Sequence, residues 1–145
     1  MIAIASDHGG FDLKSCVVKY LSENKVEFED LGTFNTDSVD YPDYAVKAAE
    51  GVAQGKYEKG IVICGTGIGI SIAANKIHGI RAALCTDSYM ARMSRQHNDA
   101  NILALGGRVI GPELALDIVE TWLNTEFLGG KHKRRIDKIA DIEKK

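Results

Sequence analysis

Short runs of apolar, mostly β-branched residues alternate along the chain with longer segments in which apolar residues recur at helical spacing. This pattern predicts five strands, at residues 2–6, 26–31, 60–64, 80–86 and 102–105. It predicts helices over residues 10–24, 41–55, 68–77, 88–96 and 112–124. The strands are apolar along their whole length, which is typical of a parallel sheet covered by helices on both faces. The chain is therefore expected to be an α/β protein.

A five-stranded sheet of this kind commonly has the strand order 2-1-3-4-5, which we adopt as the prediction. The length of 145 residues suits one domain, residues 1–145, with helices on both faces of the sheet. After Phe127 the chain becomes polar and basic, but Ile136, Ile139 and Ile142 keep helical spacing. We expect a terminal helix within about residues 129–145, and we expect this segment to pack on a partner subunit.

The expected ligand site lies where the winding of such a sheet reverses, outside the carboxyl ends of strands one and three. The first strand is followed by the sequence DHGG, residues 7–10, and the third runs into CGTGIG, residues 64–69. These are the most polar, glycine-rich corners of the chain. We therefore predict that they face each other across one crevice.

The glycine loop at residues 64–69 lacks the spacing of a dinucleotide-binding fingerprint, and no GK[ST] follows it as in a phosphate loop. Glycines allow consecutive backbone amides to turn toward one point without steric conflict. A helix is predicted to begin there, so those amides carry partial positive charge. Cys64 lies at the edge of this anion-binding loop, where positive potential favours its thiolate form.

A thiolate beside such a loop can remove a proton next to a carbonyl while the amides hold the enediolate that results. Plainer interpretations remain open: the glycines could only tighten strand–helix packing, Asp7 could be only a helix cap, and His8 a turn residue. Cys16 and Cys85 are expected to be small buried apolar side chains.

A second polar cluster is the sequence SRQHND, residues 94–99. The direction of its helix places His97 and Asn98 at the opposite edge of the sheet from Cys64. Either this is a solvated helix end, or a second subunit brings His97 to Cys64. Lys131 and Arg135, four residues apart, put two cations on one helix face and suit a phosphate, although a solvated basic tail is the simpler interpretation. Arg108 is a third candidate cation.

Composition excludes several classes of function. A net charge of -2 favours neither nucleic acid nor an anionic membrane as a partner, and no apolar run is long enough for a membrane span. The N-terminus does not resemble a signal peptide, and three scattered cysteines suit a reducing cytoplasm. The histidines lack metal-ligand spacing, so no metal site is expected.

Taken together, the DHGG corner, the string CGTGIGISIAANK and the sequence SRQHN resemble the type B ribose-5-phosphate isomerases. Their wider sugar-phosphate isomerase family includes the galactose-6-phosphate isomerase subunits. The resemblance covers essentially the whole chain, including DYP at residues 40–42 and the basic segment after residue 130. It implies a Rossmann-like αβα homodimer, in some members a dimer of dimers, that interconverts ribose 5-phosphate and ribulose 5-phosphate without a metal or cofactor.

The resemblance also implies residue roles. Cys64 is similar to the base that moves a proton between C2 and C1 through a cis-enediolate, which the loop amides hold. Thr66 and His97 resemble the pair that opens the furanose ring, with His97 as the acid. The substrate-binding positions implied are Asp7, His8, Tyr41, Gly65, Gly67, Ile68, Gly69, Asn98, Arg108, Lys131 and Arg135. Position 131 is Lys where relatives often have Arg, which keeps the charge but not the bidentate geometry.

Other functions can be distinguished by their residue requirements. A six-carbon substrate, such as allose or galactose 6-phosphate, is a close alternative. A non-catalytic sugar-phosphate or nucleotide sensor would need the glycine loop but neither Cys64 nor His97, and both are present. A thiol redox enzyme would need a CxxC motif or a resolving partner, which Cys64 lacks.

Overall fold

The structure is a computed structural model that describes residues 1–145. Its strands are β1 (Ile2–Ser6), β2 (Phe28–Asp30), β3 (Lys59–Cys64), β4 (Ala82–Leu84) and β5 (Ile102–Gly106). Its helices are α1 (Phe11–Glu23), α2 (Tyr41–Ala53), α3 (Ile68–Ala74), α4 (Ser88–Asn98), α5 (Pro112–Leu123) and α6 (Lys131–Ile142), with a short 3-10 turn η1 (His8–Gly10) before α1. None of these helices combines the length and the apolar content that crossing a membrane requires.

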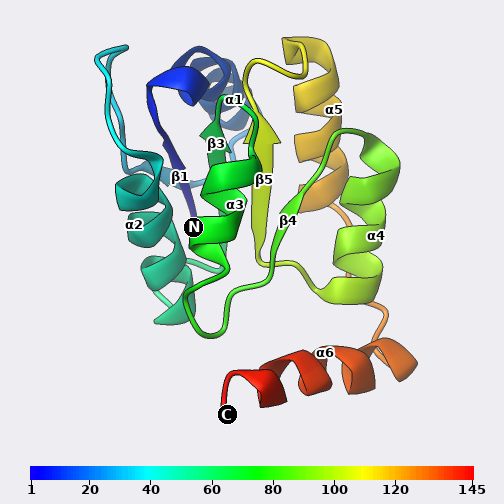
Figure 1. Ribbon diagram of the computed structural model, residues 1–145. Helices are drawn as coiled ribbons and strands as arrows, with labels where there is room; N and C mark the ends of the chain where they lie inside the picture. Colours follow the sequence, from blue (N-terminus) through cyan, green and yellow to red (C-terminus); the bar gives the residue numbers. More distant parts are fainter.

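All five strands are parallel and form one sheet between two layers of helices, so the predicted Rossmann-like αβα arrangement is confirmed. Helices α1, α4 and α5 cover one face, where Trp122 and Leu103 are buried. Helices α2 and α3 cover the other, where Ala residues such as Ala48 let α2 approach the sheet closely. The apolar runs of the strands therefore contribute to two cores, one on each face, and Figure 1 shows the helices that cover these faces.

The predicted strand order 2-1-3-4-5 is wrong at its last two places, because the observed order is β2-β1-β3-β5-β4. Strand β5 is buried along its whole length and lies between β3 and β4. Strand β4 has only three residues, all half-buried, which suits an edge. The exchange brings the end of β5 directly beside the end of β3, with Cys64 paired to Gly106.

Helix α6 lies across the amino-terminal edge of the sheet, away from the ends of the strand arrows (Figure 1). The helix predicted for this segment is present, but its apolar side chains differ in burial. Ile136 is buried, whereas Ile139 and Ile142 are 45% and 64% exposed. Much of the apolar face of α6 is thus not covered by its own chain.

Candidate functional site

The carboxyl ends of β1, β3 and β5 meet through glycines that allow backbone to approach backbone. A Cβ atom on Gly10 would lie 2.4 Å from the Ile63 oxygen, and one on Gly106 would lie 2.6 Å from the Thr66 oxygen. Such distances leave no room for a side chain. The DHGG corner and the glycine loop are therefore neighbours across β1 and β3, as predicted, and the segment after β5 joins them.

Cys64 ends β3 and is 4% exposed. The glycine loop turns around its sulfur, and the backbone N–H of Gly67 donates to Cys64 Sγ at 3.2 Å. Gly67 has a φ of 79°, in the left-handed region, and a Cβ there would lie 2.5 Å from Leu84 Cδ1. Gly67 therefore fits both the packing and the anion-binding interpretations of the loop. It allows close packing against Leu84, and it directs its amide at the Cys64 thiol.

The rest of the loop presents polar groups around this sulfur. Thr66 is exposed, and its Oγ1 accepts the N–H of Ile68 at 3.1 Å. The backbone N–H groups of Thr66 and Gly69 donate to no acceptor in the chain. Because α3 begins at Ile68, the Gly69 amide lies at the positive end of the helix dipole, which favours a ligand with negative charge.

Two predicted substrate-binding side chains border the loop directly. A Cβ on Gly69 would lie 2.6 Å from Tyr41 Cζ, so the Tyr41 ring rests against the start of α3. A Cβ on Gly65 would lie 3.2 Å from Arg108 Nη1 of the guanidinium. The backbone N–H of Arg108 also donates to the Gly65 carbonyl oxygen at 2.9 Å. Arg108 therefore supplies a guanidinium beside the glycine loop.

Asp7 and His8 form the wall from β1. Asp7 is 7% exposed, and its Oδ1 accepts the Gly10 N–H at 3.0 Å, so it is the helix cap that one interpretation predicted. His8 Nδ1 accepts the N–H of Val39 at 3.2 Å, which ties the corner to the loop before α2. Both side chains are thus held in defined orientations at the carboxyl edge.

The remaining predicted residues form a second cluster at the start of α6. A cavity of about 380 Å³ is lined by His97, Asn98, Lys131, His132 and Arg135. The rings of His97 and His132 stack with centroids 4.2 Å apart and an interplanar angle of 11°. Loss of hydration at this stack, and then the charges of His97, Lys131 and Arg135, lower the pKa of His132.

His132 is the one residue of this cavity that the sequence prediction omitted as a site residue. Its neighbour Lys131 is a predicted site residue because of its charge and its spacing of four from Arg135. The sequence signal for His132 was its place inside the same basic segment, KHKRR. Stacking on His97 depends on how α6 folds back onto α4, which no local pattern in the sequence indicates.

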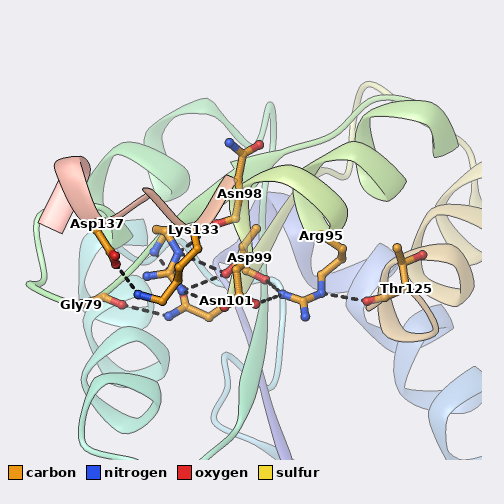
Figure 2. A network of polar contacts seen from close by, with 10 residues as sticks. Gly79, Arg95, Asn98, Asp99, Asn101, Thr125, Lys133 and Asp137 are labelled. Atoms are coloured by element: carbon orange, nitrogen blue, oxygen red, sulfur yellow. Dashed lines mark hydrogen bonds and ion pairs between the residues drawn. The ribbon is translucent and has the colours of Figure 1, made fainter. Parts of the chain in front are cut away.

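The end of α4 is held by two arginines, Arg81 and Arg95, of which Arg95 is labelled in Figure 2. The buried Arg95 donates to Asp99 Oδ1 at 2.9 Å and to the Thr125 oxygen at 3.2 Å. Arg81 Nε donates to the Asn98 oxygen at 2.9 Å. Asp99 ends the helix with a φ of 45°, in the left-handed region. This network fixes the residues that follow His97, and so the end of the helix that carries it.

The two clusters lie at opposite edges of the sheet, as the strand directions indicated. Cys64 pairs with Gly106 at the end of β5, whereas Asn98 precedes the start of β5. Asp7, His8, Tyr41, Cys64, Arg108 and the loop from Gly65 to Gly69 therefore share one edge. His97, Asn98, Lys131 and Arg135 share the other. Within one chain, His97 and Cys64 are not brought together.

The other cysteines do not form a thiol site. Cys85 is buried, and the loss of hydration raises its pKa to about 11, with Asp87 adding to the effect and Ser94 opposing it. Its thiol therefore stays protonated at neutral pH, as expected of a small apolar side chain. Cys16 on α1 is partly exposed rather than buried, which corrects the expectation for that position.

Comparison with known proteins gives one consistent answer. Residues 2–139 match the family model described as Ribose/Galactose Isomerase. The chain is 51% identical to ribose-5-phosphate isomerase B of Escherichia coli (strain K12), over 99% of this chain and 97% of the relative. It is 62% identical to ribose-5-phosphate isomerase B of Clostridium thermocellum, with a TM-score of 0.98 over 99% of this chain and 97% of that structure.

A third comparison includes a ligand. The structure of ribose-5-phosphate isomerase B from Mycoplasma genitalium with bound ribulose-5-phosphate has a TM-score of 0.95 against this chain. It is 41% identical, and the alignment covers 99% of this chain and 96% of that one. The likeness therefore extends over almost the entire length of both chains.

Proposed function

The chain belongs to the ribose/galactose isomerase family, and on that premise we propose that it interconverts ribose 5-phosphate and ribulose 5-phosphate. The observation that carries this proposal is the glycine loop wrapped around Cys64, with the Gly67 amide 3.2 Å from the sulfur. An aldose–ketose isomerase needs a base beside amides that can hold negative charge, and this corner supplies both. The bound ribulose-5-phosphate of the Mycoplasma genitalium relative supports a five-carbon sugar phosphate as the substrate.

The proton transfer follows from the arrangement around the sulfur. In the open-chain aldose, the Cys64 thiolate takes the proton from C2, and the electron pair moves through the new C1–C2 double bond onto the carbonyl oxygen O1. The amides of the loop hold the cis-enediolate that forms. Cys64 then returns the proton to C1, the hydroxyl proton of O2 passes to O1, and the carbonyl now lies at C2. No atom is gained or lost.

The furanose ring must open before this step, and the proposed acid is His97 with Thr66 as its partner. Thr66 lies in the Cys64 loop, but His97 lies at the opposite edge of the sheet. A homodimer with shared sites, or a tetramer built from two such dimers, would resolve this separation because each chain would place its His97 beside the other chain's Cys64. The exposed Ile139 and Ile142 of α6 support a partner-facing role for the segment of about residues 129–145.

Substrate binding is divided in the same way. His8 and Arg108 of one chain, with Lys131 and Arg135 of the other, would surround the phosphate with cationic or N–H donor groups. Asp7 and Asn98 would bind sugar hydroxyl groups, and Tyr41 would border the sugar. The three unpaired cysteines accord with action in a reducing cytoplasm.

A substrate comparison tests this function. The purified chain is assayed with ribose 5-phosphate, allose 6-phosphate and galactose 6-phosphate, with a chelator present throughout. We expect the highest kcat/KM for ribose 5-phosphate and no effect of the chelator. Turnover in deuterated water should also place solvent deuterium in the product. A chain that converts none of the three, or only a six-carbon sugar, contradicts the proposal.

A further inference from the structure

A charged side chain that the proposed reaction does not use is buried beneath the carboxyl edge. Lys14 of α1 is 1% exposed, and its Nζ donates to Asp30 Oδ1 at 2.5 Å. Burying an ammonium group is unfavourable unless it is paired and hydrogen-bonded. The other ion pair of α1, Lys19 with Glu23, is exposed on both sides. The Lys14 side chain is 2% exposed and the Lys19 side chain is 77% exposed, so only the first is a buried charge.

The partner of Lys14 connects it to the end of β1. Asp30 ends β2, and the same Oδ1 also accepts the N–H of Gly32 at 2.9 Å. The Gly32 oxygen accepts the Ser6 N–H at 2.7 Å, and the Thr33 N–H donates to the Ser6 oxygen at 2.8 Å. The chain after β2 is thereby bound to the residue that immediately precedes Asp7.

From this anchor a segment of residues 32–39, here called the strap, runs to α2. At its far end the Val39 N–H donates to His8 Nδ1 at 3.2 Å. A nitrogen that accepts a hydrogen bond carries no proton, so the proton of the neutral imidazole is on Nε2. The strap thus selects one tautomer of His8 and fixes the direction in which Nε2–H points.

Near the anchor, the strap also covers the lysine. The centroid of the Phe34 ring lies 5.0 Å from Lys14 Nζ, and Phe34 is 68% exposed. Gly32 has a φ of 99°, and a Cβ there would lie 3.2 Å from Phe34 Cε2. The path of the strap therefore depends on the Lys14 ammonium beneath it and on Gly32 at its start.

We propose that Lys14 is a positioning residue for His8: its ion pair with Asp30 anchors the strap, which holds His8 as an Nε2–H donor toward the substrate phosphate. This rests on the proposed function in one respect only, the assignment of the phosphate to His8. The tautomer itself is a property of the free protein.

The first test compares Lys14→Met with the matched control Lys19→Met, on the same helix. Loosening the strap weakens the binding of the phosphate but leaves Cys64 in place. We expect Lys14→Met to raise KM for ribose 5-phosphate about tenfold, as for one weakened hydrogen bond to a charged group, with kcat nearly unchanged. Lys14→Arg should recover part of the loss, and Lys19→Met should match the wild-type chain. Equal KM values for both methionine variants overturn the proposal.

The second test reads the tautomer directly from the ¹⁵N chemical shifts of His8, assigned by their loss in His8→Asn. The wild-type chain should show the proton on Nε2, and Lys14→Met should show a mixture of tautomers. If Lys14→Met does not fold, Asp30→Asn carries the same test, since it removes the charge that holds Lys14. A wild-type proton on Nδ1, or unchanged shifts in the folded variant, overturns the inference. Because the shifts need no turnover, an inactive chain with the expected tautomer counts against the proposed function alone.

Discussion

The two edges of the sheet present predicted site residues in different physical settings. At the carboxyl edge, Cys64 is 4% exposed, and its loop is held by close glycine contacts to η1 and β5. At the amino edge, the stacked pair His97 and His132 lies on helices α4 and α6, beside an open cavity of about 380 Å³. The residues around Cys64 are packed together within one chain, whereas the residues around His97 line a cavity at the surface.

The difference teaches which part of the site a single chain can build. The short backbone contact of Gly10 in η1 with Ile63 of β3 forms when β1 and β3 pair within one chain, so the proposed proton-transfer corner is assembled when the chain folds. The amino-edge cluster depends on α6, whose apolar residues Ile139 and Ile142 are exposed. We therefore expect changes at the first edge to affect chemistry, and changes at the second to depend on association.

The largest expected effect comes from the sulfur. Cys64→Ala removes the proposed base while the glycine loop and cations remain. We expect kcat to fall roughly 10²–10⁴-fold, the usual contribution of general acid–base catalysis, with ligand binding largely retained. Steady-state kinetics and calorimetric binding of ribulose 5-phosphate measure the two quantities. Cys16→Ala, at a partly exposed thiol on α1, is the matched control and should be close to wild type. Near-normal turnover in Cys64→Ala would remove the thiol from the mechanism.

A smaller but more specific effect tests the separation of the two edges. Chains carrying Cys64→Ala are mixed with chains carrying His97→Ala under conditions that exchange subunits. Each mixed dimer then has one site with both residues and one with neither. Random exchange should restore about a quarter of the wild-type activity, because half of the dimers are mixed and each has one intact site.

The control for this mixture is each inactive variant exchanged with itself, which should stay inactive. Mass spectrometry under native conditions confirms that mixed dimers form. Mixed dimers without activity would show that His97 does not act at the partner's Cys64. The comparison of the two edges would then be between an active site and a surface.

The smallest expected effect concerns pH at the amino edge. The pKa of His132 is lowered below its ordinary value of 6.5, first by lost hydration and then by His97, Lys131 and Arg135. As the pH falls below 6.5, His132 takes up a proton more readily in the unfolded chain than in the folded chain. Acidification therefore lowers the free energy of unfolding. Above that pH both states are neutral at this residue, and the contribution is constant.

Urea unfolding at a series of pH values measures this loss. The free energy of unfolding of the wild-type chain should decline on acidification below about pH 6.5, and His132→Asn should decline less. His78→Asn, at an exposed histidine in the loop after α3, is the matched control and should follow the wild type. Identical slopes for the wild type and His132→Asn would mean that the stack does not resist protonation.

Local pattern was sufficient for most of the fold and for the Cys64 corner. Uniformly apolar strands indicated a parallel sheet, and the chain direction placed His97 opposite Cys64, as the structure has it. The order of the last two strands was wrong because it depends on competition for the centre of the sheet, which the longer, fully buried β5 takes from β4. The buried Lys14 was not anticipated, since its partner Asp30 lies on another element.

The sequence by itself determined the elements, their layering and the residue types near each edge, because these follow from periodicity, chain direction and the special backbone freedom of glycine. Only the tertiary structure decided that Gly67 donates to the Cys64 sulfur, that Val39 orients His8 and that His132 stacks on His97. Each of these contacts, except the local turn at Gly67, joins residues from elements distant along the chain. Their geometry is set by packing across the whole molecule, and a short stretch of sequence carries no information about that packing.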